Sequence, residues 1–306
     1  MQQPPAKHVR SLMHVCPALL LCAPILVTAF AGCMHHRFTI SSAPRTWRDT
    51  NPWGPEALEA RDKGELKPRF YTDQMAEWAA FARENLQDGD IIFRYGYARC
   101  VSDYFENLVV TGISDCRFTH NGIVFHYGED VWVYDVEPDP QGVRKIPFEF
   151  WMLDTIPGRF AVMRLKEPYR STIPQALTYC EAAWRRQPPF DNALRLNDDR
   201  LYCSEMIEKA FRSAGLALSE PITIRCLPRY EHYKLLKPLV DRFTELSFDE
   251  PEFNLGNEHF GTFGSPYLDL VYGGENRKHG EALPPICPPV PFPAKPTFAD
   301  CVTRPQ

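Results

Sequence analysis

The sequence predicts an α+β fold in which a small antiparallel sheet packs on helices. Two segments, residues 171–186 and 203–214, carry apolar side chains at helical spacing. Residues 120–126, 131–136 and 160–165 have the composition of short strands, and a turn joins the first two. Strands and helices do not alternate in the βαβ order of parallel sheets, which favours an antiparallel arrangement.

The other elements follow from the same spacing rules. Residues 72–85 place apolar side chains on one helical face. Residues 91–93 are a short apolar run after a Gly-Asp pair and are expected to form a strand. The helix at 171–186 has Pro174 in its first turn, where the missing N–H would have no partner in any case.

The chain divides by composition into four parts. We expect a signal segment, a linker, a globular domain with an irregular C-terminal appendage, and a proline-rich tail at residues 1–33, 34–70, 71–275 and 276–306. The formal net charge of −5 argues against a nucleic-acid partner, because phosphate contacts need a basic surface.

The N-terminal segment has the features of an export signal. Lys7 and Arg10 precede an uncharged, mostly apolar stretch, and the stretch ends in Phe30-Ala31-Gly32-Cys33. These four residues resemble the lipobox of bacterial lipoproteins. The resemblance implies that Cys33 is lipidated, so that a lipid anchor holds the protein at the bacterial cell envelope, facing the periplasm or the exterior.

Seven cysteines follow Cys33, and an exported protein can form disulfides. The short-loop pairs Cys100–Cys116 and Cys287–Cys301 are the first candidates. Cys180 lies on the apolar stripe of its helix, so we expect it to be a buried thiol. No cysteine or histidine cluster has the spacing of a zinc site, and we expect neither a metal nor another cofactor.

Cys203 begins the clearest amphipathic helix in the chain. The apolar residues after it recur at spacings of three and four, and Gly215 follows where a helix end favours a residue with positive φ. A thiol at a helix N-terminus lies near unpaired N–H groups, whose partial positive charge favours the reactive thiolate. Cys203 is therefore a candidate nucleophile.

The predicted hairpin supplies a candidate base and a candidate acid. With residues 127–130 as the turn, His120 lies opposite Glu137, and opposed Cβ atoms are roughly 4.5–5.5 Å apart. A carboxylate at that distance can orient an imidazole and favour its protonated form. A shift of the register by two residues would put Asp135 in this place, so Asp135 is the alternative orienting acid.

Five short motifs follow one another along the chain: Gly89-Asp90-Ile91-Ile92, Thr119-His120-Asn121-Gly122, Val136-Glu137, Phe190-Asp191 and Tyr202-Cys203-Ser204-Glu205. Their order resembles the circularly permuted papain-like amidases, more narrowly the YiiX-like branch of the NlpC-type cysteine hydrolases. The resemblance covers roughly residues 86–215. It implies a permuted papain-like hydrolase domain with Cys203 as nucleophile, His120 as base and Glu137 as orienting acid. Asn121 and Pro138 depart from the usual pattern.

Three functions are compatible with these residues. The first is a cysteine amidase or peptidase that cleaves an envelope amide, such as a cell-wall peptide. The second is a lipid-directed esterase or acyltransferase on the same fold, acting on an acyl substrate. The third is a non-catalytic envelope binding lipoprotein, which the presence of all three candidate residues disfavours.

Overall fold

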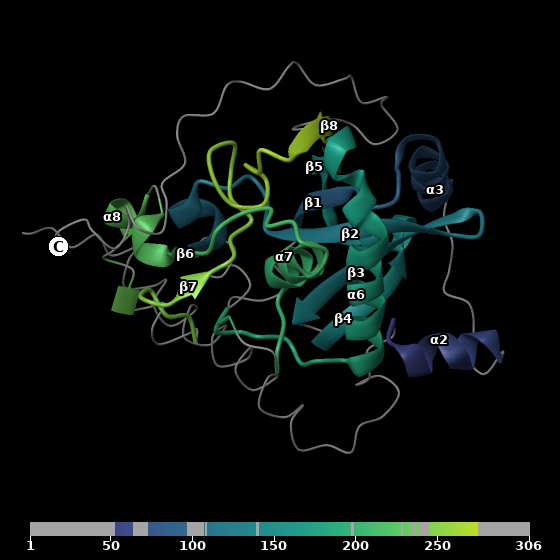
Figure 1. The fold of residues 1–306 in the computed structure, drawn as a ribbon, viewed down its shortest axis with the longest axis horizontal. Helices are drawn as coiled ribbons and strands as arrows, with labels where there is room; N and C mark the ends of the chain where they lie inside the picture. Colours follow the sequence, from purple (N-terminus) through teal and green to yellow (C-terminus); the bar gives the residue numbers. More distant parts are fainter. Residues whose placement is uncertain are drawn as a thin grey trace, which may run out of the picture. The chain divides into compact units, whose positions relative to one another are not determined.

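The computed structural model describes residues 53–63, 73–96, 107, 109–138, 141–196, 199–227, 229–233, 235, 237–238 and 245–274. The signal segment, Cys33 and the proline-rich tail lie outside these residues. The described part contains a six-stranded antiparallel sheet with the strand order β4-β3-β2-β1-β5-β8, flanked by helices on both faces (Figure 1). The predicted α+β class is confirmed.

The strands of this sheet are β1 (Ile91–Gly96), β2 (His120–Tyr127), β3 (Asp130–Pro138), β4 (Gln141–Pro147), β5 (Thr155–Leu165) and β8 (Leu268–Gly274). The helices of the body are α2 (Pro55–Asp62), α3 (Asp73–Asn85), α5 (Phe148–Trp151), α6 (Ile173–Arg186), α7 (Cys203–Ser213) and α8 (Tyr230–Tyr233). A two-stranded sheet pairs β6 (Ile222–Thr223) with β7 (Pro251–Glu252), and η1 (Val109–Ile113) is a π-helical turn. None of the described helices is long and apolar enough to cross a lipid bilayer.

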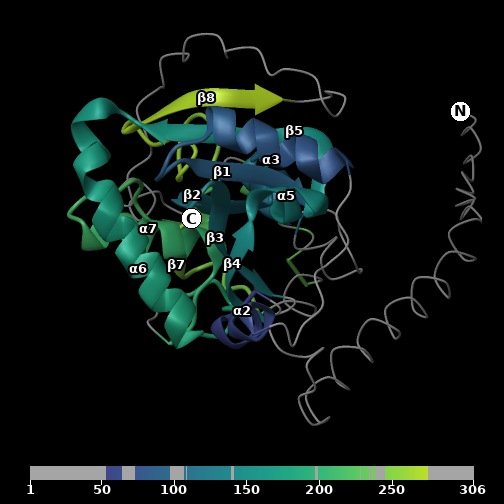
Figure 2. The same ribbon diagram turned by 90° about the vertical axis from the view of Figure 1, so that its right-hand side faces the viewer.

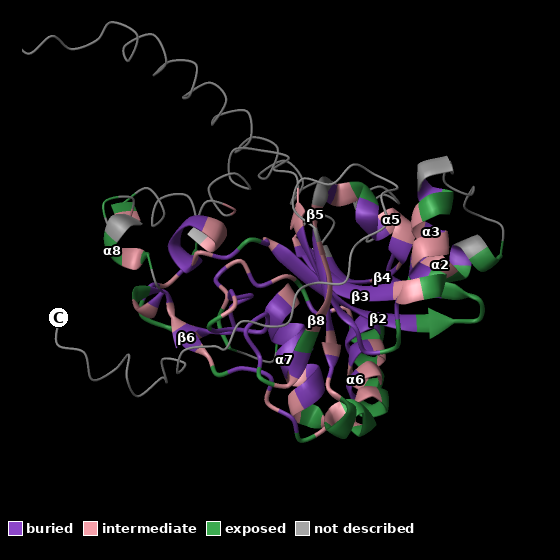
Figure 3. Ribbon diagram, turned by 90° about the horizontal axis from the view of Figure 1, so that it is seen from above, coloured by how far each residue is buried: buried purple, intermediate pink, exposed green. Residues whose placement is uncertain are grey.

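Each face of the sheet carries its own apolar core. Helices α6 and α7 cover one face and α3 and α5 cover the other (Figure 2). On β1, Ile91 and Phe93 belong to the first core and Ile92 to the second, because side chains alternate along a strand. Both cores exclude water from the strands, which are coloured as buried along most of their length (Figure 3).

The register of the β2–β3 hairpin is the predicted one. His126 pairs with Val131 and Ile123 with Tyr134. The turn is shorter than expected, because Tyr127 and Asp130 still pair and only two residues connect them. A shorter turn about the same centre leaves every pair unchanged, so the placement of His120 near the acids of β3 does not depend on the turn length.

Helix α7 starts and ends as the sequence indicates. It begins at Cys203 and buries Met206, Ile207 and Ala210 against the sheet. Gly215 after its end has φ 84°, which glycine adopts without strain. The helix carrying the predicted nucleophile is therefore fixed by its apolar face against β2 and β3.

The body of the protein includes segments that the sequence did not assign to it. Part of the expected linker forms α2, and the Trp53 carbonyl accepts hydrogen bonds from the Lys145 N–H at 3.1 Å and the Trp184 indole at 2.8 Å. The expected appendage contributes β8 to the main sheet and Phe263 to its core. Strand β4 also had no prediction.

The structure confirms the prediction for Cys180 and contradicts the one for Cys116. Cys180 is buried on α6, as predicted. Cys116 is a free, buried thiol, so the proposed Cys100–Cys116 pair is wrong. The loop that holds Cys116 encloses its sulfur, which accepts a hydrogen bond from the Phe118 N–H at 3.4 Å. Cys287 and Cys301 lie outside the described residues.

Candidate active site

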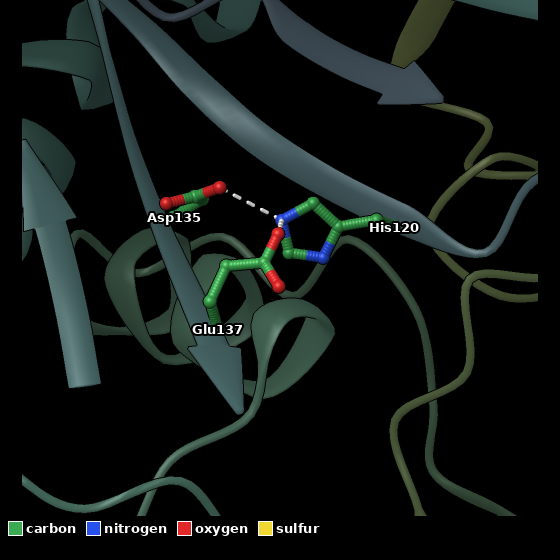
Figure 4. Close-up of side chains that lie close together, drawn as sticks. All are labelled: His120, Asp135 and Glu137. Atoms are coloured by element: carbon green, nitrogen blue, oxygen red, sulfur yellow. Dashed lines mark hydrogen bonds and ion pairs between the residues drawn. The ribbon is translucent and has the colours of Figure 1, made fainter. Parts of the chain in front are cut away.

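Strands β2 and β3 bring one histidine and two carboxylates together. The His120 Nε2 atom lies 2.8 Å from Asp135 Oδ2 and 3.3 Å from Glu137 Oε1. All three side chains are buried. One ring nitrogen points at the acids and the other points away from them (Figure 4). The structure thus brings the predicted base to both candidate acids, with the shorter contact to Asp135.

Two arginines hold these carboxylates. Arg144 on β4 donates from Nε to Asp135 Oδ1 at 2.7 Å and also from Nη2 to Oδ2. The same Nη2 lies 3.1 Å from Glu137, which also pairs with Arg94 on β1. Both guanidinium groups are buried, so the site contains two cations and two anions shielded from water. Charges in such a place are stable only when they are paired in this way.

Trp151 at the end of α5 completes the wall of the site. Its indole Nε1 donates to Asp135 Oδ2 at 2.8 Å, and its ring stacks on that of His120 with centroids 6.1 Å apart. The Arg94 guanidinium lies over the same indole, 4.4 Å from the ring centroid. A single buried side chain therefore contacts the base, one acid and one arginine.

The charges around the two acids keep them ionised. Burial alone would raise the pKa of Asp135, but the charge and hydrogen bonds of Arg144, and then those of His120, hold this pKa well below its usual range. Burial opposes ionisation of Glu137 as well, and Arg144, His120 and Arg94 lower its pKa in turn. His120 therefore faces two carboxylates that are negative at neutral pH.

The pKa of the His120 imidazole depends on the acids and on Cys203. Burial disfavours the charged ring, yet the charges of Glu137 and Cys203, and hydrogen bonds that the ring donates to Asp135 and Cys203, raise the pKa of His120 to about 9. Helix α7, which begins at Cys203, packs its apolar face against β2, the strand that begins at His120. At neutral pH the imidazole is protonated.

The loop before α7 positions this thiol. Asp191 is buried and accepts hydrogen bonds from the N–H groups of Ala193 and Arg195, both at 3.0 Å. Just before the helix, the Tyr202 hydroxyl accepts the Phe253 N–H at 2.7 Å. The Phe190-Asp191 motif thus fixes the backbone that leads into Cys203.

The buried histidine and carboxylates are side chains that can bind metal ions. His120, Asp135 and Glu137 offer ligand atoms that lie within 4.8 Å of one another. The same carboxylate oxygens, however, already accept hydrogen bonds from the guanidinium groups of Arg144 and Arg94. A divalent cation would have to displace these positive groups or lie against them, so the residues present do not fit a metal.

Several residues of the site had no sequence signal. Arg94, Arg144 and Trp151 lie in segments whose charged or aromatic residues look like ordinary surface or core positions. A buried arginine on a strand can be recognised only once the carboxylate beside it is known. Asn121, the departure noted after His120, is fully buried, and neither atom of its amide has a partner among the described residues.

The comparisons with known proteins concern the family and the fold. Residues 85–227 match the family model described as permuted papain-like amidase enzyme, YaeF/YiiX, C92 family. This part of the chain is a permuted papain-like amidase domain. The match places these residues among the permuted papain-like cysteine amidases, in the YaeF/YiiX family that the motifs indicated.

One solved structure supports the same fold. The crystal structure of the metalloprotein yiiX from Escherichia coli O157:H7 matches with a TM-score of 0.50 and 19% sequence identity, covering 62% of this chain and 97% of that one. At this identity the likeness concerns the fold, and the permuted papain-like architecture is confirmed. Among curated proteins, none matches this chain significantly.

Proposed function

We propose that the domain hydrolyses an amide with Cys203 as the nucleophile and His120 as its acid–base partner. The observation that carries this proposal is the buried imidazole of His120 on β2, which is held 2.8 Å from Asp135; β2 is the strand against which the helix that begins at Cys203 packs. A protonated imidazole beside the sulfur stabilises the thiolate, the form that attacks a carbonyl.

The proposed reaction has two stages. The thiolate attacks the amide carbonyl, and His120 donates its proton to the leaving amine as the C–N bond breaks. The now neutral imidazole takes a proton from water, the resulting hydroxide cleaves the thioester, and the sulfur leaves as the thiolate beside the imidazolium. The N–H of Cys203 is the first donor for the developing oxyanion. Tyr202, the N-cap of α7, makes no side-chain capping hydrogen bond, so its side chain does not compete for this end of the helix.

The acid that orients His120 is best assigned to Asp135. Its oxygen is the closer of the two, and three other donors fix the same carboxylate: Arg144 through two atoms and the Trp151 indole. Glu137, the acid expected from the family resemblance, lies 0.5 Å farther from the ring nitrogen, at 3.3 Å against 2.8 Å. We propose that Asp135 orients the ring and that Glu137 adds negative charge beside it.

Labelling of the thiol tests this proposal. In the wild type we expect a mild thiol electrophile, iodoacetamide, to modify Cys203 before any other cysteine near pH 7. His120→Ala should remove this advantage, and His126→Ala is the matched control, because His126 lies on the same strand but is exposed to solvent. Equal, slow modification of all free thiols in the wild type would contradict the proposal.

The substrate class can be separated with the same preparation. We propose a peptide or cell-wall-like amide at the bacterial envelope, because the family is one of amidases. Incubation with cell-wall peptides should release free amines. Turnover of acyl lipids with no release from peptides would instead favour the lipid-directed esterase or acyltransferase.

We propose further that Cys33 anchors the protein to the envelope membrane through a lipid. The support is the sequence pattern of a signal segment that ends in Ala31-Gly32-Cys33. A palmitate analogue should label the wild type and leave Cys33→Ala unlabelled. Equal labelling of both would contradict the anchor.

A further inference from the structure

One arginine on β5 has no anionic partner in the part of the chain that the structure describes. The guanidinium of Arg159 on β5 lies over the ring of Tyr95 on β1, with its central carbon 4.1 Å from the ring centroid. Among the residues that the structure describes, none forms an ion pair or hydrogen bond with its side chain. Arg94 and Arg144, by contrast, are each paired with a carboxylate of the site. The positive charge of Arg159 is therefore not neutralised by Asp135 or Glu137, which pair with Arg144 and Arg94.

The sheet places this arginine at the active-site end of its strands. Arg94 pairs with His120 on one side and with Phe160 on the other, and Gly96 pairs with Thr155. Between these pairs β5 advances five residues while β1 advances two, so β5 has a bulge that ends at Arg159. Bulges of this kind redirect side chains and are frequent beside active sites.

Two hydrogen bonds join the residues that flank Tyr95 to Thr119, the residue before His120. The N–H of Gly96 donates to the Thr119 hydroxyl at 2.9 Å, and the Thr119 N–H donates to the Arg94 carbonyl at 2.9 Å. Thr119 directly precedes His120. The residues on either side of Tyr95 are therefore hydrogen-bonded to Thr119, which fixes the backbone that carries the Tyr95 ring beside the strand of His120.

The strand spacing gives the separation of the two positions. Strand β5 is two strands from β2, and neighbouring strands lie about 4.8 Å apart, so Arg159 is roughly 10 Å from His120 measured between backbones. An extended peptide advances about 3.3 Å per residue, so a group at that distance belongs to a residue about three positions from the scissile amide.

We propose that Arg159 is a specificity-determining residue that binds a carboxylate of the substrate, a few residues from the amide that Cys203 attacks. This inference rests on the proposed function. A planar guanidinium matches a carboxylate with two parallel hydrogen bonds, and stacking on Tyr95 holds its plane while leaving its N–H edge free. The half-buried position strengthens such a contact relative to an arginine in open water.

Alkylating peptides test the inference without knowledge of the natural substrate. Bromoacetyl peptides of one, two and three alanines are prepared with a terminal carboxylate and with a terminal carboxamide. The Cys203 thiolate displaces bromide from the bromoacetyl carbon and forms a thioether. At the length that reaches Arg159, we expect the carboxylate peptide to react about tenfold faster than its carboxamide twin, the size of effect that a hydrogen-bonded ion pair provides.

Two variants decide the outcome. In Arg159→Gln the ratio of the two rates should fall to about one, and it should stay unchanged in Arg185→Gln. Arg185 is the matched control, because it lies exposed on α6 and pairs with Glu181. Equal rates for both peptides at every length in the wild type, or a preference that survives Arg159→Gln, would overturn the inference.

The same rates separate this inference from the proposed function. If no bromoacetyl peptide modifies Cys203 faster than the other thiols, the nucleophile assignment fails and the specificity role fails with it. A bromoacetyl phosphoethanolamine probe tests the other common anion. A gain with this phosphate probe alone would replace the carboxylate with a phosphate and overturn the assignment.

Discussion

Replacing Asp135 with asparagine should change the pH at which His120 loses its proton. The pKa of His120 is raised from 6.5 to about 9, a gap that corresponds to roughly 3 kcal/mol in favour of the imidazolium. Asp135→Asn removes the closer negative charge, and it leaves the Arg144 guanidinium near the ring without its closest anion, although Glu137 still lies 3.1 Å from it. Both changes disfavour the imidazolium, so we expect the pKa to fall by about one to two pH units.

The sign of the effect follows from the proton balance. Because the pKa is higher in the folded protein than the ordinary value of 6.5, the imidazolium stabilises the fold fully below about pH 6.5, and this stability is lost as the pH rises through about 9. Catalysis needs the same proton for the leaving amine. The wild-type rate should therefore fall as the pH rises through about 9, and the Asp135→Asn rate should fall at lower pH.

Two measurements check this prediction. The pH profile of kcat/KM on a peptide amide gives the alkaline limb, and NMR of ¹³C-labelled histidine gives the titration of His120 itself. Asp130→Asn is the matched control, since Asp130 begins the same strand and is exposed. Removing one partner of a buried ion pair can cost about 3–5 kcal/mol, so the double variant Asp135→Asn, Arg144→Gln, which removes both charges of the pair, is measured as well. An alkaline limb that stays near 9 in both variants would refute the reasoning and favour Glu137 as the orienting acid.

Three further outcomes are expected. Trp151→Phe keeps an aromatic ring beside His120 but loses the 2.8 Å indole hydrogen bond to Asp135. Urea unfolding should show that the free energy of unfolding falls by about 1–2 kcal/mol. An unchanged unfolding midpoint would contradict the role given to the indole. Gly122→Ala would place a Cβ 2.5 Å from a Val133 methyl and should destabilise the fold by about 1–3 kcal/mol, whereas Gly96→Ala on the next strand, with nothing nearer than 3.5 Å, serves as its comparison. Burial raises the pKa of the Cys116 thiol to about 12, so mass spectrometry should find it unmodified by iodoacetamide at pH 8 until the protein unfolds; rapid native labelling would show that it is accessible.

Local patterns in the sequence predicted the helices and the hairpin because those elements bury one regular face. The start of α7 at Cys203 followed from its apolar spacing. The His120 register followed from counting outward from the turn, and it survived an error in the turn length because shortening a turn about its centre preserves the pairs. Information that lies within a few residues along the chain was therefore sufficient for these features.

The missed features depend on contacts between distant segments. Strand β4 contains Gly142, Arg144 and Pro147, which hide the alternation of a strand, and Arg144 points inward because Asp135 is there to receive it. The preference for Asp135 over Glu137 likewise depends on Trp151, which no spacing rule connects to β3. Tertiary pairing decides these positions, and a single sequence does not display it.

Strand β8 has a practical consequence for anyone who shortens this protein. The family match ends at residue 227, yet β5 is covered along its outer side by residues 268–274, about forty residues later. A version truncated at the family boundary would leave β5 with a row of unpaired backbone donors and acceptors, and strands in that condition recruit other copies. Such a fragment should self-associate in solution more than one that continues through Gly274, in which β8 keeps the outer side of β5 paired.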